Sequence, residues 1–176
     1  MKVFIVSLDP GIRHCGLALF VNRKLVKAGL ARNPEASLRG PPAWMTMANS
    51  VEEMLTPWLT ELGFVGGDEV FLAAEIPQVY RGPTKADPDD LMQLTGVVGA
   101  VTGLVSHAIG YFPFAWKKNI PKGIHQTRLR RRLDAKETAV LEGADCPPSL
   151  LHNVIDAVGI GLHHLLRLRV KNKDAT

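Results

Sequence analysis

Short apolar runs alternate along the chain with longer segments of helical periodicity. The runs are rich in β-branched and aromatic residues and have the length of buried strands, and they predict strands at residues 3–8, 15–21, 24–29, 69–74 and 111–115. Pro10-Gly11 and Asn22-Arg23 separate the first three runs. These pairs predict tight turns, so the first three strands are expected to follow one another closely.

Apolar residues recur at every third or fourth position in other parts of the chain. With the flanking Gly, Pro and acidic residues, this spacing predicts helices at residues 43–62, 91–107, 123–133, 134–141 and 150–168. Pro57 lies inside the first helical pattern and is expected to kink or divide that helix. Ser149 follows two prolines and is the expected N-cap of the last helix.

The order of these elements favours an α/β fold built on one five-stranded mixed β-sheet flanked by α-helices. The first three strands would form an antiparallel meander. The fourth and fifth are reached through helical crossovers and would run parallel to the first. A chain of 176 residues suits a single domain over residues 1–176, with 168–176 as a flexible basic tail.

Three acidic residues stand where unpaired burial would be costly. Asp9 ends the first predicted strand, Glu75 ends the fourth, and Asp156 lies on the last helix. The two strands are expected to be neighbours, so these carboxylates would repel one another unless a cation neutralised them. Oxygen-rich ligands suit Mg²⁺ or Mn²⁺ better than Zn²⁺. Taken alone, Asp9 is also consistent with a turn-capping role.

The last helix carries two further candidate ligands. His152 and Asn153 share a helical face with Asp156, since they precede it by four and three positions. Two divalent ions about 4 Å apart can activate water and stabilise the leaving oxygen in phosphodiester hydrolysis. The alternative role for His152 is to cap the helix near Ser149.

The composition and the distribution of charge indicate that the protein binds a polyanion. Hydrophobic residues make up 46% of the chain and charged residues 22%, which is ordinary for a globular protein, and no apolar stretch has the roughly 20 residues of a membrane span. The net charge is +4, yet residues 1–115 hold nine Lys/Arg against eleven Asp/Glu, and residues 116–176 hold twelve against six. Such asymmetry favours binding to a polyanion such as nucleic acid.

The two cysteines have no disulfide or metal-site spacing, which indicates reduced thiols and a cytoplasmic location.

The motifs together resemble the RuvC-type Holliday-junction resolvases of the RNase H-like superfamily, especially the bacteriophage-borne members. The resemblance spans almost the whole chain and is carried by LDPGIRHCGLALF, AAEIPQ, DDLMQLTGVVGAV, AWKKNIPKGIHQTRL and HNVIDAVGIGL. It implies an RNase H-like fold and a homodimer that nicks four-way and other branched DNA in symmetric pairs, during recombination or phage DNA processing. It also implies two Mg²⁺ per active site, for which Mn²⁺ would substitute, with neither a small-molecule cofactor nor a membrane partner.

The resemblance carries the metal-binding, catalytic role over to Asp9, Glu75 and Asp156. The fourth family ligand is Asp or His at the position that Asn153 occupies here, and we favour His152, one residue earlier, because imidazole is the stronger ligand. The loop after Glu75 would contact DNA, with Tyr80 stacking on a base. The expected phosphate-binding residues are Arg81 and Lys85 in that loop, and Lys117, Lys118, Lys122, Arg128 and Arg131 in the basic segment that Trp116 and Pro121 interrupt.

Three other functions fit parts of the pattern. A YqgF-type nuclease acting on RNA opens with a similar motif, but such chains are shorter and lack the basic module over residues 116–133. ATP-binding proteins of the actin and sugar-kinase superfamily need a second domain and a second phosphate-binding turn. A non-catalytic junction-binding protein would result if Asn153 has inactivated the site.

Overall fold

The computed structural model describes residues 2–35, 37–78 and 87–168. The expected DNA-contact loop with Tyr80, Arg81 and Lys85, and the basic tail from residue 169 onward, therefore lie outside the described residues. The strands are β1 (Val3–Asp9), β2 (His14–Val21), β3 (Lys24–Arg32), β4 (Glu69–Glu75) and β5 (His107–Tyr111). The helices are α1 (Pro41–Glu61), α2 (Pro88–Thr102), α3 (Pro113–Lys117), α4 (Lys122–Arg130), α5 (Ala135–Glu142), the 3₁₀ helix η1 (Pro148–Leu150) and α6 (Leu151–His164).

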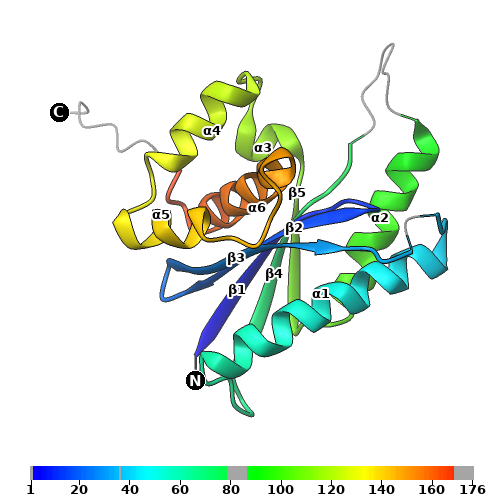
Figure 1. Cartoon of the computed structure of the whole chain (residues 1–176), viewed down its shortest axis with the longest axis horizontal. Helices are drawn as coiled ribbons and strands as arrows, with labels where there is room; N and C mark the ends of the chain where they lie inside the picture. Colours follow the sequence, from blue (N-terminus) through cyan, green and yellow to red (C-terminus); the bar gives the residue numbers. More distant parts are fainter. Residues whose placement is uncertain (1, 36, 79–86, 169–176) are drawn as a thin grey trace.

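The five strands form one sheet in the order β3-β2-β1-β4-β5. β1 pairs antiparallel with β2 and β2 antiparallel with β3, whereas β4 is parallel to both β1 and β5. Helices α1 and α2 cover one face of the sheet, and α6 with α3, α4 and α5 covers the other (Figure 1). The predicted α/β fold and mixed topology are confirmed.

The segment between α2 and α3 differs from the prediction. The second helix was expected to reach residue 107 and the fifth strand to span 111–115, but α2 ends at Thr102 and β5 covers His107–Tyr111. Residues 113–117 form α3 instead, with Pro113 at its first position, where the missing N–H costs nothing. Gly103 is the C-cap of α2, and the low helix propensity of glycine favours an end to the helix at this position.

Two further details of the helices differ from the prediction. Helix α1 is not divided at Pro57, which lies inside it. Ser149 does not cap the last helix; it lies within η1, which precedes α6 and makes no side-chain cap. None of the described helices combines the length and apolar character needed to cross a bilayer.

Alternation along the strands divides the core between the two faces of the sheet. On β1, Phe4, Val6 and Leu8 pack against α1 and α2, so the residues between them point toward α6. Ser7 follows this rule, because its side chain lies beside Gly161 of α6. The same rule places the last residue of β1, Asp9, on the α6 face.

Helix α6 packs unusually closely on the sheet, and glycines make this possible. A Cβ at Gly16 of β2 would lie 2.0 Å from the backbone oxygen of Asn153, and one at Gly161 would lie 2.2 Å from the ring of Phe20. No heavy atom tolerates such distances, so both positions exclude any larger side chain unless the helix moves. Val154, Val158 and Leu162 of α6 are fully buried in the apolar core on this face of the sheet.

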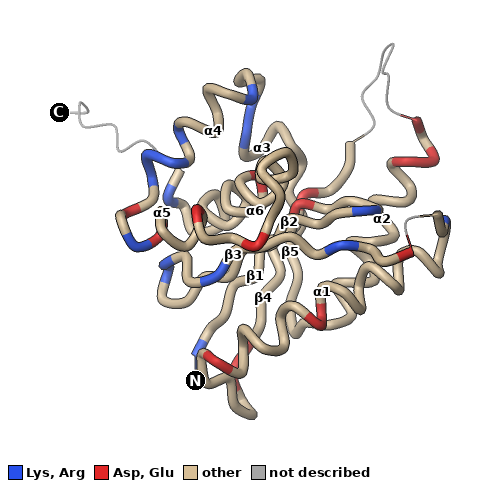
Figure 2. Tube along the Cα trace, in the orientation of Figure 1, with Lys and Arg blue, Asp and Glu red and all other residues tan. Residues whose placement is uncertain are grey.

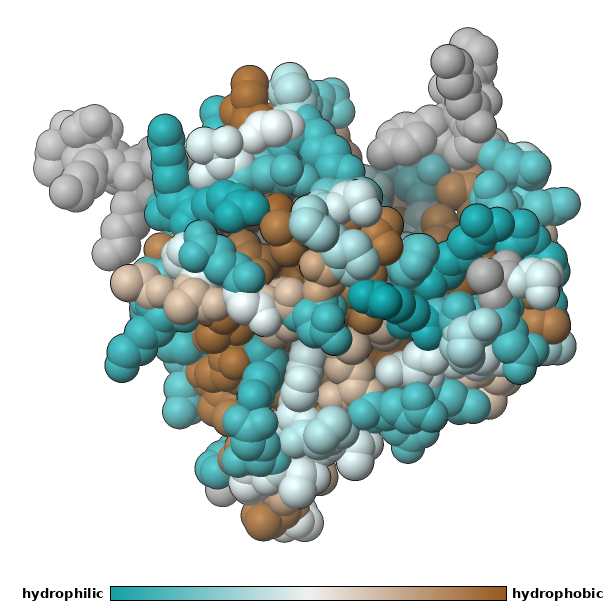
Figure 3. Space-filling model, in the orientation of Figure 1, coloured by the Kyte–Doolittle hydropathy of each residue, from teal (hydrophilic) through white to brown (hydrophobic). Residues whose placement is uncertain are grey.

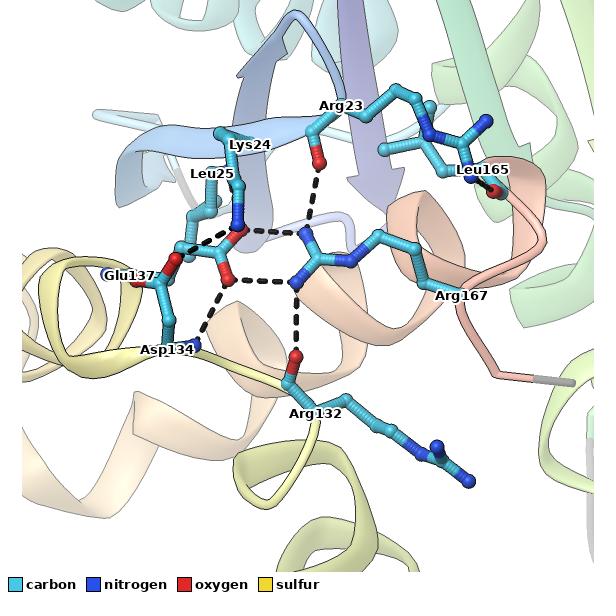
Figure 4. A network of polar contacts seen from close by, with 8 residues as sticks. All are labelled: Arg23, Lys24, Leu25, Arg132, Asp134, Glu137, Leu165 and Arg167. Carbon is cyan, nitrogen blue, oxygen red and sulfur yellow. Dashed lines mark hydrogen bonds and ion pairs between the residues drawn. The ribbon is translucent and has the colours of Figure 1, made fainter. Parts of the chain in front are cut away.

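A polar network centred on the buried Glu137 carboxylate links the segment after α6 to the start of α5 (Figure 4). The Glu137 carboxylate accepts hydrogen bonds from the backbone N–H of Leu25 at 2.9 Å and from Arg167 Nη2 at 2.7 Å. Burial raises the pKa of Glu137, but hydrogen bonds from Arg167 and backbone groups outweigh it and leave the pKa below its ordinary value. Arg167 also donates to the backbone oxygens of Arg23 and Arg132, so this network joins the β2–β3 turn, the end of the basic helix α4 and the C-terminal segment.

We predict that Gly16→Ala destabilises the protein by about 1–3 kcal/mol, because the added methyl would overlap the backbone of α6. The matched control is Gly123→Ala in the exposed first turn of α4, where an added Cβ meets no atom within 4 Å. The control should be neutral or stabilise by less than about 1 kcal/mol. Urea unfolding of both variants measures the difference, and equal stabilities would contradict the close approach of α6 to β2.

Candidate active site

The acidic ends of β1 and β4 lie next to each other on one face of the sheet. The two strands are parallel neighbours in register, with Leu8 opposite Ala74, so Asp9 and Glu75 each follow directly after this pair. On β4, Leu72 and Ala74 pack toward α1 and α2, whereas Ala73 packs toward α6. Alternation therefore points both carboxylates toward α6, which confirms the placement expected from the sequence.

Helix α6 supplies the third carboxylate. Its close contact with β1 and β2 brings Asp156, which is partly buried, to the same edge of the sheet. The negative charges of Asp156 and Glu75 both act on Asp9, and that of Glu75 acts on Asp156. The fold thus brings together three acidic residues that are far apart in the chain, as predicted.

Glu75 is held by two neighbours from α3. Its Oε2 atom accepts a hydrogen bond from Trp116 Nε1 at 2.9 Å and forms an ion pair with Lys117 Nζ at 2.9 Å. The Lys117 ammonium also lies 4.8 Å from the centre of the Trp116 ring, a cation–π distance. These contacts fix the Glu75 side chain, which is only 16% exposed, and bring a positive charge among the carboxylates.

The pKa values show how strongly these groups interact. Burial raises the pKa of Asp9 well above its ordinary value, and the nearby charges of Asp156 and Glu75 raise it further. Burial also raises the pKa of Asp156, while Lys117 and Lys122 oppose the shift. Burial lowers the pKa of Lys117, but Glu75 and the two aspartates outweigh it, so the net pKa is raised and the ammonium stays charged.

His152 and Asn153 occupy different surroundings on α6. His152 Nδ1 lies 3.0 Å from the backbone oxygen of Ser149. A carbonyl oxygen only accepts hydrogen bonds, so Nδ1 is the donor in this contact and the other ring nitrogen, Nε2, takes no part in it. The positive charge that His152 can carry acts on Asp156. The Asn153 residue instead lines a cleft beside Pro10 and Gly11.

The donor chemistry of this site fits a hard divalent cation. Carboxylate oxygens dominate the set, which is the preference of Mg²⁺ and Mn²⁺. In the arrangement described, no three acidic, histidine or cysteine side chains of the described residues are grouped tightly enough to hold a metal ion. Glu75 is engaged by Lys117 and Trp116 instead, so metal binding would require these side chains to rearrange.

The predicted phosphate contacts divide into two groups. Lys117 is half-buried against Glu75, and its ammonium faces the carboxylates rather than open solvent. The other four side chains are exposed and lie on or beside α3 and α4, where Figure 2 shows a concentration of basic residues; they are Lys118, Lys122, Arg128 and Arg131. The basic segment therefore adjoins the acidic site, and the charge of Lys122 reaches both Asp9 and Asp156.

Sequence reasoning missed the role of Trp116. It was expected to interleave with the basic residues of a DNA-binding loop, but it is 4% exposed and packs between α6 and His125. Its indole N–H orients Glu75, so we describe it as a positioning residue. The sequence offered one signal of this role: Trp116 directly precedes Lys117, the residue that pairs with Glu75.

No protein-family model and no curated protein sequence matches the chain. Solved structures do match its fold. T. thermophilus RuvC in complex with a Holliday junction substrate is similar with a TM-score of 0.60 and 18% identity, over 93% of this chain and 92% of that one. A second T. thermophilus RuvC structure is similar with a TM-score of 0.57 and 17% identity, over 92% of this chain and 93% of that one.

The yeast mitochondrial Holliday junction resolvase Ydc2 is similar with a TM-score of 0.51 and 6% identity, over 93% of this chain and 81% of that one. Sequence identity is low in all three comparisons, so the likeness is one of fold. It nevertheless extends over more than nine tenths of this chain in all three comparisons, and this part of the chain contains the five-stranded mixed sheet. The chain therefore has the RNase H-like fold of the RuvC-type Holliday-junction resolvases.

Proposed function

We propose that this protein is a divalent-metal-dependent endonuclease that nicks branched DNA, with the four-way junction as its principal substrate. The observation that carries the proposal is the convergence of Asp9, Glu75 and Asp156 from three separate elements at one edge of the sheet. Burial and mutual repulsion of these carboxylates destabilise the protein, and a role in binding cations explains why they are placed together. The fold shared with structures of Holliday-junction resolvases supports the choice of substrate.

Asp9, Glu75 and Asp156 would hold the metal ions, with His152 as the fourth ligand. Bound divalent ions supply an activated water and stabilise charge on the phosphate oxygens. The hydrogen bond from His152 Nδ1 to Ser149 supports this assignment, because metal-binding histidines commonly donate their second ring N–H to a carbonyl. Trp116 orients Glu75, and Lys117 supplies a fixed positive charge beside the position of the scissile phosphate.

The exposed cations of α3 and α4 would bind DNA phosphates on the α6 side of the sheet. Lys118 also lies over the ring of Phe114, which is 52% exposed and offers an apolar surface beside the charges. Phosphate contacts of this kind position a nucleic acid without reading its sequence, which suits recognition by shape. The loop residues Tyr80, Arg81 and Lys85 remain part of the proposal.

We further propose that the active unit is a homodimer formed through α2. Its Met92 side chain is 65% exposed, and Trp44, Leu91 and Gly96 line an apolar groove beside it. A two-fold dimer would present two active sites to a four-way junction, whose arms are themselves related by symmetry, and would account for paired cuts.

We predict that Asp9→Asn lowers junction cleavage by about a thousandfold, equivalent to several kcal/mol of lost transition-state stabilisation, while junction binding is retained. The assay uses an end-labelled immobile four-way junction with Mg²⁺, Mn²⁺ or EDTA, and linear duplex and structured RNA as competing substrates. The matched control is Asp145→Asn, an exposed aspartate outside the site, which should cleave normally. Cutting of RNA but not of the junction would favour the YqgF-type alternative, and junction binding without any cut would favour a non-catalytic role.

We predict that the same Asp9→Asn variant unfolds at a higher temperature than the parent at pH 7.5 in EDTA. The pKa of Asp9 is raised in the folded state, so the folded protein binds more protons than the unfolded chain, and stability is lost as pH rises through the folded pKa. Asparagine removes this loss, and each kcal/mol regained shifts the melting temperature by about 2–4 °C. The gain should shrink as pH falls toward 4, and a variant that is less stable at every pH would contradict the repulsion described here.

We predict that His152→Ala weakens Mn²⁺ binding by about tenfold or more, whereas Asn153→Ala changes it by less than about threefold. Isothermal titration of Mn²⁺ into each variant measures the affinity without reliance on cleavage. The reverse ranking would assign the fourth ligand to Asn153.

A further inference from the structure

A second cluster of positive charge lies on the other side of the acidic site from α3 and α4. A cleft of about 440 Å³ is bordered by the β1–β2 turn, the segment before α1, the first turns of α2 and the start of α6. Its basic lining residues are Arg13, His14 and Arg39, and its only carboxylate among the described residues is that of Asp90. Hydrophilic side chains cover this region, over the ends of β2 and β3 between α6 and α1 (Figure 3).

The cleft adjoins the catalytic carboxylates directly. Pro10, on its wall, follows Asp9 in the chain, and Asn153, on another wall, lies one helical turn before Asp156. A nucleic-acid strand whose scissile phosphate lies at the carboxylates would therefore pass the cleft with its next phosphates.

The turn that carries Arg13 is held rigidly. Asn33, which is 7% exposed, donates from Nδ2 to the backbone oxygen of Ile12 at 3.2 Å and from its own N–H to that of Arg13 at 2.9 Å. Cys15 braces the same turn from inside through sulfur contacts with the N–H and oxygen of Gly11 at 3.3 and 3.2 Å. A braced turn presents its side chain at a fixed place, which reduces the entropy cost of binding.

The basic side chains of this cleft are not used for internal ion pairs. Within the described residues, neither Arg13 nor Arg39 forms an ion pair, and both are exposed. Burial lowers the pKa of His14, and the charges of Arg32 and Arg13 lower it further, which shows that positive charge accumulates here. Among the described lining residues, His14 carries the one aromatic ring on which a base could stack. The charge and composition of the lining therefore favour a phosphate group over a nucleobase or nucleotide as the ligand.

We propose that this cleft, through Arg13 and Arg39, binds backbone phosphates of the DNA strand that enters or leaves the active site on the side of α1 and α2. The inference rests on the proposed nuclease function and extends it: the catalytic carboxylates lie between two phosphate-binding surfaces, one on α3 and α4 and the other in the cleft. Guanidinium groups bind phosphate through paired N–H donors, so each arginine suits one phosphate.

The test measures how salt weakens DNA binding. Each lost phosphate contact lowers the slope of log K against log salt concentration by about 0.9 in duplex DNA. Arg13→Gln and Arg39→Gln should each lower the slope by about this amount, and the double variant by about 1.8. The assay is fluorescence anisotropy with a labelled four-way junction and, separately, a labelled linear duplex, in EDTA so that no strand is cut.

Two further variants make the result specific. Lys136→Gln on α5 removes one exposed positive charge away from the cleft and should leave the slope unchanged. Asp90→Asn removes the opposing carboxylate, so it should strengthen binding without lowering the slope. Because its effect has the opposite sign, loss of folding cannot mimic it.

The outcomes separate the cleft from the proposed function. If the parent protein binds and cuts the junction but the double arginine variant keeps the parental slope, the cleft proposal is wrong and the nuclease proposal stands. If the parent binds neither junction nor duplex, both are wrong. If duplex and junction are bound but not cut and the slope still falls by about 1.8, the cleft binds phosphate in a protein whose nuclease function is contradicted.

Discussion

The close approach of α6 to the sheet is the contact on which the site depends. Gly16 and Gly161 leave space for only a hydrogen atom between the helix and the strands, and the apolar face of α6 fills the rest of the interface. A helix held farther out would keep its hydrophobic contacts in part, but it would carry Asp156 away from Asp9 and Glu75. The network around Glu137 and Arg167 holds the other end of the same helix, so its position is fixed along its full length.

The packing of α6 brings three carboxylates together, and nearby positive charges and hydrogen-bond donors offset their repulsion only in part. Lys117 and the Trp116 N–H satisfy Glu75, whereas burial and repulsion still raise the pKa of Asp9. A core built for stability alone would have replaced these groups by apolar ones. Retained repulsion of this kind is expected where a site must bind cations, because the energy lost in the folded protein is regained on binding.

The positive charges surround this acidic edge on two sides. The cations of α3 and α4 lie on the face of the sheet covered by α6, and the arginines of the cleft lie toward α1 and α2. Neither group lies at the far end of the sheet where β1 begins. A polyanion bound by both groups would cross the carboxylates between them, so the charge distribution agrees with the proposed position of the active site.

The sequence by itself determined the sheet, most of the helices and the identity of the acidic residues, because alternation, helical spacing and turn residues are local properties of the chain. It also placed Asp9 and Glu75 at adjacent strand ends, since parallel neighbours bring their carboxyl ends to one edge. Only the tertiary structure decided the boundary between α2 and β5, the inward turn of Trp116 and Lys117, and the cleft that joins Arg13 to Arg39. These features depend on contacts between segments far apart in the chain, which no local pattern of residues encodes.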